Sequence, residues 1–457
     1  MKRATIAILV AGSLFSAACN VGPRYKRPAT PVPETIRGAE PQSDQASIAD
    51  LAWWELFRDE QLQSLIRAAL AQNYDLRSAV ERIAEARAQL GITRSARYPD
   101  VSLDASATAG KAQGGTKSTF FTLAPDASYQ LDLFGKVHNQ IVAGQAQVTA
   151  AEESRNSVIL SLVGEVAADY FQLLTLDAAL KTAQDTAAAQ ESSVTLVKTR
   201  LEYGATTQVE LLQAQQVLDS ARAQIPDLER QIAQTENALN LLAGRLPAGI
   251  ERGKLLDEQY LPPAAPEGVP SSLLERRPDI RSAEQQLIVA NANIGVARAA
   301  FFPNISFSVS GGGTMGHATS ASSGQTTLWS AAGQLSQPIF NGGRLRSNLK
   351  VTEAQQREAL LTYQQTIQKS FGEVSDAAIG YHKLHEVRLQ QDSNVKHLAE
   401  AEALSRQRYE GGLVAYSEVL DAQRVLFSAR LSLAQARGNE QIALVTLYKT
   451  LGGGWQK

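Results

Sequence analysis

The chain has 457 residues, enough for two or three ordinary domains or for one elongated body. Its 44 Lys and Arg residues nearly balance 46 Asp and Glu residues, so the formal charge of −2 excludes a general attraction to nucleic acid. A single cysteine excludes an intrachain disulfide and a cluster of cysteine metal ligands. Aromatic residues make up only 6% of the chain, whereas Ala, Gln, Glu, Leu and Arg are abundant, which favours long helices over a compact β core.

The first twenty residues, MKRATIAILVAGSLFSAACN, have the pattern of a secretory signal peptide. A charged start precedes an apolar run from Ile6 to Phe15, which is too short to cross a bilayer about 30 Å thick. Small residues precede Cys19, as cleavage at that point requires. We therefore expect residues 1–18 to be removed from the mature protein.

Cys19 directly follows this cleavage point, as in the precursor of a bacterial lipoprotein. Lipid on its thiol and on the new amine would anchor the chain, because two or more acyl chains hold a protein stably on a membrane where one does not. Ser16 stands where the lipoprotein pattern usually has leucine, so the alternative is an ordinary signal peptide with an incidental cysteine. Asn20 follows the cysteine. Aspartate at that position usually signals retention in the inner membrane, so its absence favours the outer membrane. Residues 19–50 are polar and rich in proline, which predicts an extended, lipid-anchored tether.

The rest of the chain repeats one plan twice. The segment DLRSA at 75–79 matches DIRSA at 279–283, and Pro99 matches Pro303, both with a shift of 204 residues. Further along the shift is 208 residues, as in these pairs: Gly204 and Gly412, Glu210 and Glu418, Gln215 and Gln423, Arg222 and Arg430, Gly244 and Gly452. A period this long indicates a duplicated structural unit, with repeats at 51–260 and 261–457. Each repeat is predicted to contain a helix, a strand pair, a long helix and a shorter helix.

The long helices are predicted at about 135–203 and 342–410. No proline lies between Pro125 and Pro226 or after Pro338, so nothing in these stretches breaks a helix that would be about 100 Å long. Apolar residues recur at the three- and four-residue spacing of coiled-coil packing: Ile159, Val163, Val166, Tyr170 and Leu173. The other surfaces of these helices are polar. The apolar stripe therefore needs other helices packed alongside it over its whole length.

The strand pairs are predicted at about 100–134 and 303–340, each entered at a proline. Apolar and polar residues alternate in the segments VSLDASATAG, ASYQLDLF, NISFSVSG and WSAAGQL. This alternation suits a sheet with lipid or a core on one face and water on the other, and a soluble sheet with one wet face is the alternative. Four strands cannot close a barrel, and a sheet in lipid has no open edges, so several chains must combine their strands. Two chains would give eight strands and three would give twelve.

Five segments together resemble the outer-membrane factor family, the TolC-like, NodT-type lipoproteins of tripartite efflux systems: CNVGPRYKRPATPVP, RRPDIRSAEQQL, AAFFPNISF, PIFNGGR and RYEGGLVAYSEVLDAQR. The resemblance covers the chain from Cys19 to Gly453. It implies an α+β membrane protein that forms a homotrimer, with a twelve-stranded outer-membrane β-barrel continuing into a periplasmic α-helical coiled-coil barrel. The duplicated hairpins would then give six similar helix pairs around one axis.

The same resemblance implies a function without catalysis: a passive, gated conduit that exports small molecules from the periplasm to the exterior. The implied partners are a periplasmic adaptor protein, an inner-membrane RND-type transporter and outer-membrane lipid. A type I protein-secretion channel and a structural periplasmic coiled-coil lipoprotein are the alternatives. No cofactor is expected beyond the lipid on Cys19.

The gate implied by the resemblance involves Asp421, Arg424, Tyr409 and Ser417. Three Asp421 carboxylates near the axis would form an acidic ring, while Tyr409 and Arg424 would hold neighbouring helices shut. Ser417 lies one turn before Asp421, where relatives have a bulkier apolar residue. From spacing alone, Asp421 and Arg424 are a surface pair worth about 0.2–0.5 kcal/mol.

The hairpin turns are predicted at Gly204 and at the pair Gly411 and Gly412. Glycine permits a left-handed turn after a long helix, and these tips are also the expected adaptor contact. His382 and His385 are three residues apart on a helix, but no third metal ligand accompanies them, so no metal site is predicted. The loop GKAQGGTKS lies between two strands rather than before a helix, which argues against a phosphate site.

Overall fold

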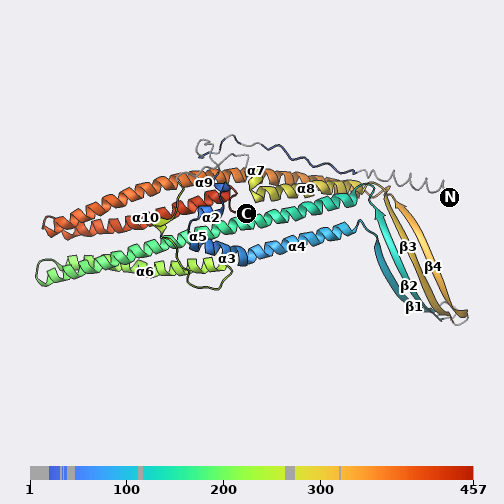
Figure 1. The fold of residues 1–457 in the computed structure, drawn as a ribbon, viewed down its shortest axis with the longest axis horizontal. Coiled ribbons are helices and arrows are strands. Elements are labelled where there is room, and N and C mark those ends of the chain that lie inside the picture. The colour runs from blue at the N-terminus through green and yellow to red at the C-terminus, as the bar shows by residue number, and fades with distance from the viewer. Residues whose placement is uncertain are drawn as a thin grey trace. The chain divides into compact units, whose positions relative to one another are not determined.

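The computed structural model describes residues 20–30, 33, 35, 37–38, 47–111, 117–262, 273–318 and 321–455. The predicted signal peptide, Cys19 and most of the segment 31–46 lie outside these residues. The described elements come in this order (Figure 1): η1 (Ile48–Asp50), α2 (Trp53–Leu56), α3 (Glu60–Gln72), α4 (Tyr74–Ser95), β1 (Asp100–Lys111), β2 (Lys117–Leu131), α5 (Lys136–Glu202), α6 (Gln208–Leu242), η2 (Leu256–Glu258), α7 (Leu273–Arg276), α8 (Pro278–Ala299), β3 (Asn304–Ala318), β4 (Ala321–Ser336), α9 (Arg344–Glu410) and α10 (Tyr416–Thr450).

The three longest helices of the first repeat each have a counterpart of equal length in the second. Helices α4 and α8 both have 22 residues, α5 and α9 both have 67, and α6 and α10 both have 35. The long helices begin and end within two residues of the predicted bounds, because each is bounded by glycine-containing turns and contains no proline. The duplicated long helices and four strands of the predicted fold class are confirmed.

The chain folds into two compact parts, and each takes segments from both repeats. The first, the sheet unit, comprises Met1–Thr30, Glu81–Glu152 and Ser282–Gln365. The second, the core unit, comprises Pro31–Val80, Glu153–Arg281 and Thr366–Lys457. This division differs from the division into repeats, because the long helices carry residues of both units.

The core unit holds the main hydrophobic core. Phe57 packs against Phe171 and Tyr448, with ring centroids 6.2 and 6.1 Å apart. Four of the five predicted apolar positions of α5 are buried here, namely Val163, Val166, Tyr170 and Leu173, and Ile159 packs against them. One 18-residue stretch of α5 is long and apolar enough to span a membrane, but 61% of it is buried inside the protein. That burial is typical of a core helix in a bundle.

The buried carboxylate of Asp59 joins three segments of the core unit. It caps α3 by accepting hydrogen bonds from the backbone N–H groups of Gln61 and Leu62 at 2.9 and 3.2 Å. It also accepts from the Tyr170 hydroxyl of α5 at 3.1 Å and from the Lys254 N–H at 3.0 Å. Burial alone would raise the pKa of Asp59, but its hydrogen bonds outweigh burial and hold the pKa below the ordinary value.

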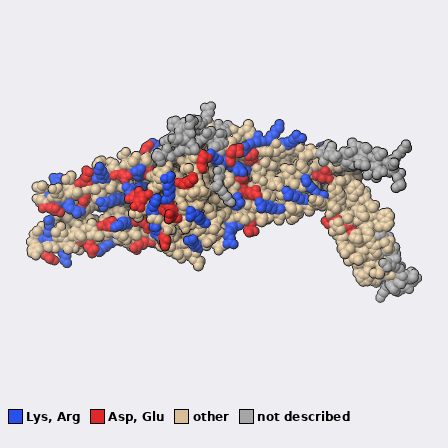
Figure 2. All heavy atoms as spheres, in the orientation of Figure 1, with Lys and Arg blue, Asp and Glu red and all other residues tan. Residues whose placement is uncertain are grey.

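The four strands of the sheet unit form one antiparallel sheet in the order β1-β2-β3-β4. The register places the apolar residues of neighbouring strands opposite one another: Leu103 faces Pro125, Tyr129 faces Phe307, and Val309 faces Ala331. The predicted apolar positions within the strands therefore share one face, and Leu103, Trp329 and Leu335 there are 66%, 80% and 67% exposed. In Figure 2 the visible surface of the strands carries few charged side chains, whereas charges of both signs cover the helices.

Pro125 lies inside β2, a central strand, where a ladder hydrogen bond is normally required. Residues 124 and 125 pair with β1, but the pairing with β3 skips from Leu123 to Asp126. Gly312 of β3 lies at this gap, and a Cβ there would approach the Leu123 carbonyl oxygen to 2.3 Å. The missing N–H of Pro125 is thus accommodated by a local break in the β2–β3 ladder and by a residue without a side chain.

Candidate functional site at the hairpin tips

The two helical hairpins, α5–α6 and α9–α10, have the same type of turn at their tips. At the first tip, Gly204 has φ +69°, its N–H donates to the Leu201 carbonyl at 2.9 Å, and the Ala205 N–H donates to the Arg200 carbonyl at 2.8 Å. At the second tip, Gly412 has φ +72° and makes the equivalent bonds, to Tyr409 and, through Leu413, to Arg408, each 2.9 Å long. These paired bonds form a Schellman motif, in which the left-handed residue is normally glycine.

Gly411 does not share this conformation. The positive φ at the second tip belongs to Gly412 alone, so the expectation that both glycines serve the left-handed turn is wrong for Gly411. A Cβ at Gly411 would meet the Arg408 carbonyl oxygen at an ordinary 3.5 Å, and a Cβ at Gly204 or Gly412 would meet open space. The backbone conformation, rather than crowding, therefore requires glycine at Gly204 and Gly412.

A small hydrophobic cluster, here called the tip cluster, joins the ends of the two hairpins. Its buried members come from both hairpins: Val197, Leu211, Ala214, Tyr416, Val419 and Leu420. Tyr409 packs at its margin, with its ring centroid 5.0 Å from that of Tyr416 and 4.9 Å from the guanidinium carbon of Arg200. Arg200 belongs to the first hairpin and Tyr409 to the second, so this cation–π contact ties the two hairpins together. Burial raises the pKa of Tyr416.

The remaining candidate gate residues lie on one exposed face of α10. Ser417, Asp421 and Arg424 follow each other at spacings of four and three residues, so they share a face of the helix. Arg424 donates to Asp421 at 2.8 Å, and the two side chains are 69% and 68% exposed. Tyr409 lies instead beside Tyr416 and Arg200. Within one chain, the four candidate residues therefore form two separate groups.

A buried polar chain next to the tips was not predicted. The Gln190 amide of α5 donates to Gln423 of α10 at 2.9 Å, and Gln423 donates to Glu402 of α9 at 3.1 Å. Arg406 in turn donates to Glu402. Gln423 and Gln215 occupy equivalent positions in the two repeats, which was the only sequence signal for this chain of hydrogen bonds. That signal is weak, because glutamines are common on these helices and the partner Gln190 lies 233 residues away.

Among the described residues, no group of three or more His, Cys, Asp or Glu side chains is placed to hold a metal ion. His385, one of the histidines considered above, lies within 2.5 Å of the buried Glu440 carboxylate, which Arg388 also contacts at 2.9 Å. Its position is explained by this contact between α9 and α10.

Comparison with known proteins gives a consistent set of matches. The model of the outer membrane efflux protein family matches twice, at residues 65–245 and 269–453, so each repeat matches it once. The cation efflux system protein CusC of Escherichia coli is 35% identical over 451 residues, covering 97% of this chain and 98% of CusC. SilC of Salmonella typhimurium, a probable outer membrane lipoprotein, is 33% identical over 446 residues, covering 97% of each chain.

A solved structure shares the fold over nearly the whole chain. The outer membrane channel MtrE of Neisseria gonorrhoeae in its open state has a TM-score of 0.87 and 31% sequence identity, covering 96% of this chain and 99% of MtrE.

Proposed function

The chain belongs to the outer membrane efflux protein family, and on that premise we propose that three copies form a passive conduit through the outer membrane. The family and the outer-membrane location agree with the expectation from the sequence. The observation that carries the proposal is the sheet, which exposes one apolar face and leaves β1 and β4 as open edges within the chain. Lipid suits such a face only if the edges of neighbouring copies pair. Three copies would supply twelve strands, the number expected above.

The helical hairpins provide the rest of the conduit. Their equal lengths and identical turns would let three chains present six similar hairpins around one axis. The tips would meet a periplasmic adaptor protein. An inner-membrane transporter of the RND type would supply the energy for export, and the conduit itself would perform no catalysis. A lipid on Cys19 would add an anchor, which is consistent with the similarity to the probable lipoprotein SilC.

Conductance across a planar lipid bilayer tests this function. Protein purified in detergent and reconstituted into a planar bilayer is expected to form discrete channels. The same preparation is expected to be trimeric by native mass spectrometry. A trimer without conductance, or a monomer that stays with the soluble fraction, would favour the structural coiled-coil alternative.

The gate is proposed at the exposed face of α10, with Asp421 from each copy facing the axis. Replacing Asp421 with alanine should raise single-channel conductance, because the acidic constriction and its pairing with Arg424 are removed. The matched control is Asp227→Ala on α6, since Asp227 forms the same kind of exposed pair with Arg230, three residues on, at 2.6 Å. An Asp421→Ala channel that conducts like the Asp227→Ala channel would remove Asp421 from the constriction.

A further inference from the structure

A groove lies between α9 and α10 within the core unit, far along both helices from the hairpin tips. One stripe of each helix lines it, and the stripes include these residues: Glu373, Ala377, Gly380 and Leu384 on α9, and Asn439 and Ala443 on α10. The α9 residues follow one another at spacings of four, three and four, so they share one face of the helix. The groove has a volume of about 450 Å³, which lies within the range of about 300–1,000 Å³ that is typical of small-molecule sites.

Small residues leave this space open. Ala377 of α9 and Ala443 of α10 are buried, at 7% and 9% exposed, and their short side chains form the floor. Gly380 lies between them and solvent, and no atom of another described element lies within 4 Å of a Cβ built there. Positions with this spacing between packed helices usually carry larger apolar side chains, which fill the seam. The groove therefore exists because three small residues stand at these positions.

The first repeat carries longer side chains at the same positions. The segment GEV at 372–374 matches GEV at 164–166, so α9 and α5 are in register at the shift of 208 residues. At that shift the small residues of the groove pair with larger ones: Gly380 with Gln172, Ala377 with Asp169, and Ala443 with Thr235. Two hairpins of equal length thus differ where the groove lies. The groove belongs to the second repeat and does not follow from the duplication.

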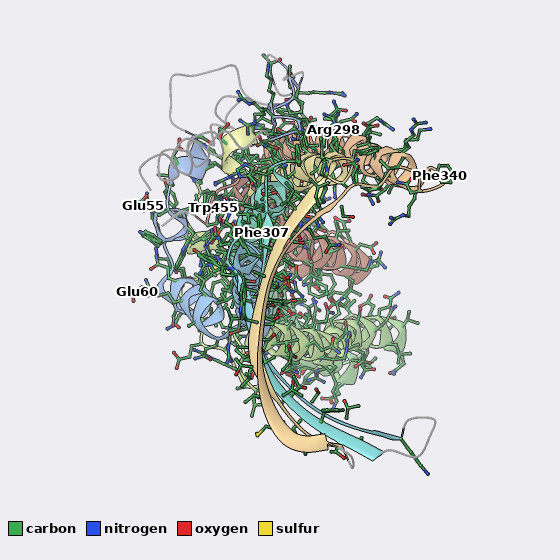
Figure 3. All side chains as sticks on the ribbon, turned by 90° about the vertical axis from the view of Figure 1, so that its right-hand side faces the viewer. Glu55, Glu60, Arg298, Phe307, Phe340 and Trp455 are labelled. Atoms are coloured by element: carbon green, nitrogen blue, oxygen red, sulfur yellow. The ribbon has the colours of Figure 1, made fainter. Side chains whose placement is uncertain are left out.

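One end of the groove is braced by Arg277, which is 8% exposed. Its guanidinium donates to the Glu373 carboxylate of α9 at 2.7 Å and to the Thr450 carbonyl of α10 at 3.2 Å. Just after α10, the indole N–H of Trp455, which is labelled in Figure 3, donates to the Arg276 carbonyl of α7 at 3.1 Å. These contacts hold α7, α9 and α10 together at this end. The space between α9 and α10 is therefore formed without a ligand, as most small-molecule sites are.

The charges that line the groove are of one sign. Its lining residues include the carboxylates of Glu373 and Asp376 and no lysine or arginine. Glu373 is already paired, with Arg277 at 2.7 Å and with Lys369 at 3.7 Å. Asp376 is exposed at the edge of the groove, so its carboxylate is the charge that an occupant would meet. An apolar floor with one carboxylate at its edge favours an apolar body that carries a positive charge.

We propose that this groove binds an amphiphilic organic cation of drug size, with its apolar body over Ala377 and Gly380 and its charge beside Asp376. The proposal rests on the conduit proposed above, and it names a class of exported molecule that contacts the conduit on its way. Burial of the apolar body supplies most of the affinity, because the Asp376 carboxylate is exposed and screened by water. The carboxylate supplies the choice of a cation over an anion of the same size.

Binding of two fluorescent probes to the full-length protein, held in nanodiscs of zwitterionic lipid, tests the site. The probes are ethidium, which is an apolar cation, and N-phenylnaphthylamine, which is apolar and uncharged. Gly380→Gln introduces the residue of the first repeat and should weaken the binding of both probes at least about tenfold, because the new side chain occupies the groove. The matched control is Gly372→Gln, on the exposed side of the same helix, where a new Cβ also meets open space. This control should bind both probes as the wild type does.

Asp376→Asn tests the class of ligand. It should weaken the binding of ethidium about two- to fivefold, the range expected for one exposed charge pair, and leave the binding of N-phenylnaphthylamine unchanged. Asp227→Asn, on α6 and outside the groove, is the control for the loss of one negative charge and should change neither. If Asp376→Asn binds ethidium as tightly as the wild type does, the assignment to cations is wrong.

The remaining outcomes separate the groove from the conduit. Channels that conduct, in a protein whose probe binding does not change with Gly380→Gln, would overturn the site and leave the proposed function intact. Probe binding that depends on Gly380, in a protein that forms no channels, would overturn the conduit and keep the site. If Gly380→Gln abolishes the native trimer and Gly372→Gln does not, the groove is occupied by another copy of the chain, which would overturn its role in binding a small molecule.

Discussion

The carboxylate of Asp59 shows how one residue can hold a junction of segments together. It is 1% exposed, and its hydrogen bonds join the start of α3, Tyr170 of α5 and the segment around Lys254. Asp59→Ala should lower the free energy of unfolding by about 2–4 kcal/mol, because it removes a helix cap and leaves buried donors without an acceptor. A lower thermal unfolding midpoint of the detergent-solubilised protein would report this loss, and Asp257→Ala, at an exposed residue of η2, serves as the control.

The same residue predicts a pH dependence. The folded-state pKa of Asp59 lies below its ordinary value, so its stabilising contribution is fully present above the unfolded-state pKa of about 3.9. That contribution is lost as the pH falls through the lower folded-state pKa. The stability gap between the wild type and Asp59→Asn should therefore be constant near neutral pH and narrow below about pH 4. A gap that widened on acidification would contradict this role.

Residue contacts of this kind could be predicted from the sequence only where they follow a local pattern. The glycines at the tips follow long helices, which is a local signal. Gly438, in contrast, lies in the middle of α10, and a Cβ there would overlap the Thr175 hydroxyl of α5. Its counterpart in the first repeat is Arg230, which is exposed, so the duplication gives no hint of the close approach. Tertiary packing alone determines that position.

At the scale of elements, the two adjacent glycines at the second tip have different backbone conformations, and only Gly412 is left-handed. Gly412→Ala should raise the rate of amide hydrogen exchange around Leu413, because a left-handed alanine costs about 1–2 kcal/mol. Gly411→Ala should change local stability by about 0.5 kcal/mol or less, since its backbone conformation suits any residue. Exchange followed by mass spectrometry compares the two variants at the same peptides. Equal acceleration in both variants would mean that the left-handed turn is not what stabilises the tip.

The bounds of the long helices could be predicted because proline and glycine mark them, whereas two prolines inside elements could not be placed. Pro226 lies within α6, although proline in a helix interior removes a hydrogen bond and typically costs about 3 kcal/mol. Its counterpart in α10 is Ala434, which is buried. Pro125 lies within β2, as described above. In both cases the packing of a long element outweighs the preference of proline against helix and strand interiors. A sequence pattern does not reveal that packing.

At the scale of the whole molecule, alternation along the strands predicted two faces but not what covers them. The structure adds that the apolar sets of all four strands coincide on one face and remain exposed in the single chain. The number of copies, and the faces that α4 and α9 present to them, depend on contacts between chains. A pattern within one sequence constrains these contacts only through the duplication.

The orientation of the sheet toward lipid can be tested with two neighbouring residues of β1. Leu103 lies on the apolar face and Ser102 on the opposite face, and both are exposed in the single chain. Leu103→Lys should reduce the amount of assembled protein in the outer membrane, because a lysine facing lipid costs from about 0–1 kcal/mol near an interface to about 2–4 kcal/mol at the bilayer midplane. Ser102→Lys adds the same charge toward water and should assemble like the wild type. The assembled fraction is read from heat-resistant oligomers in purified envelopes, and loss of assembly in Ser102→Lys alone would mean that the opposite face meets the lipid.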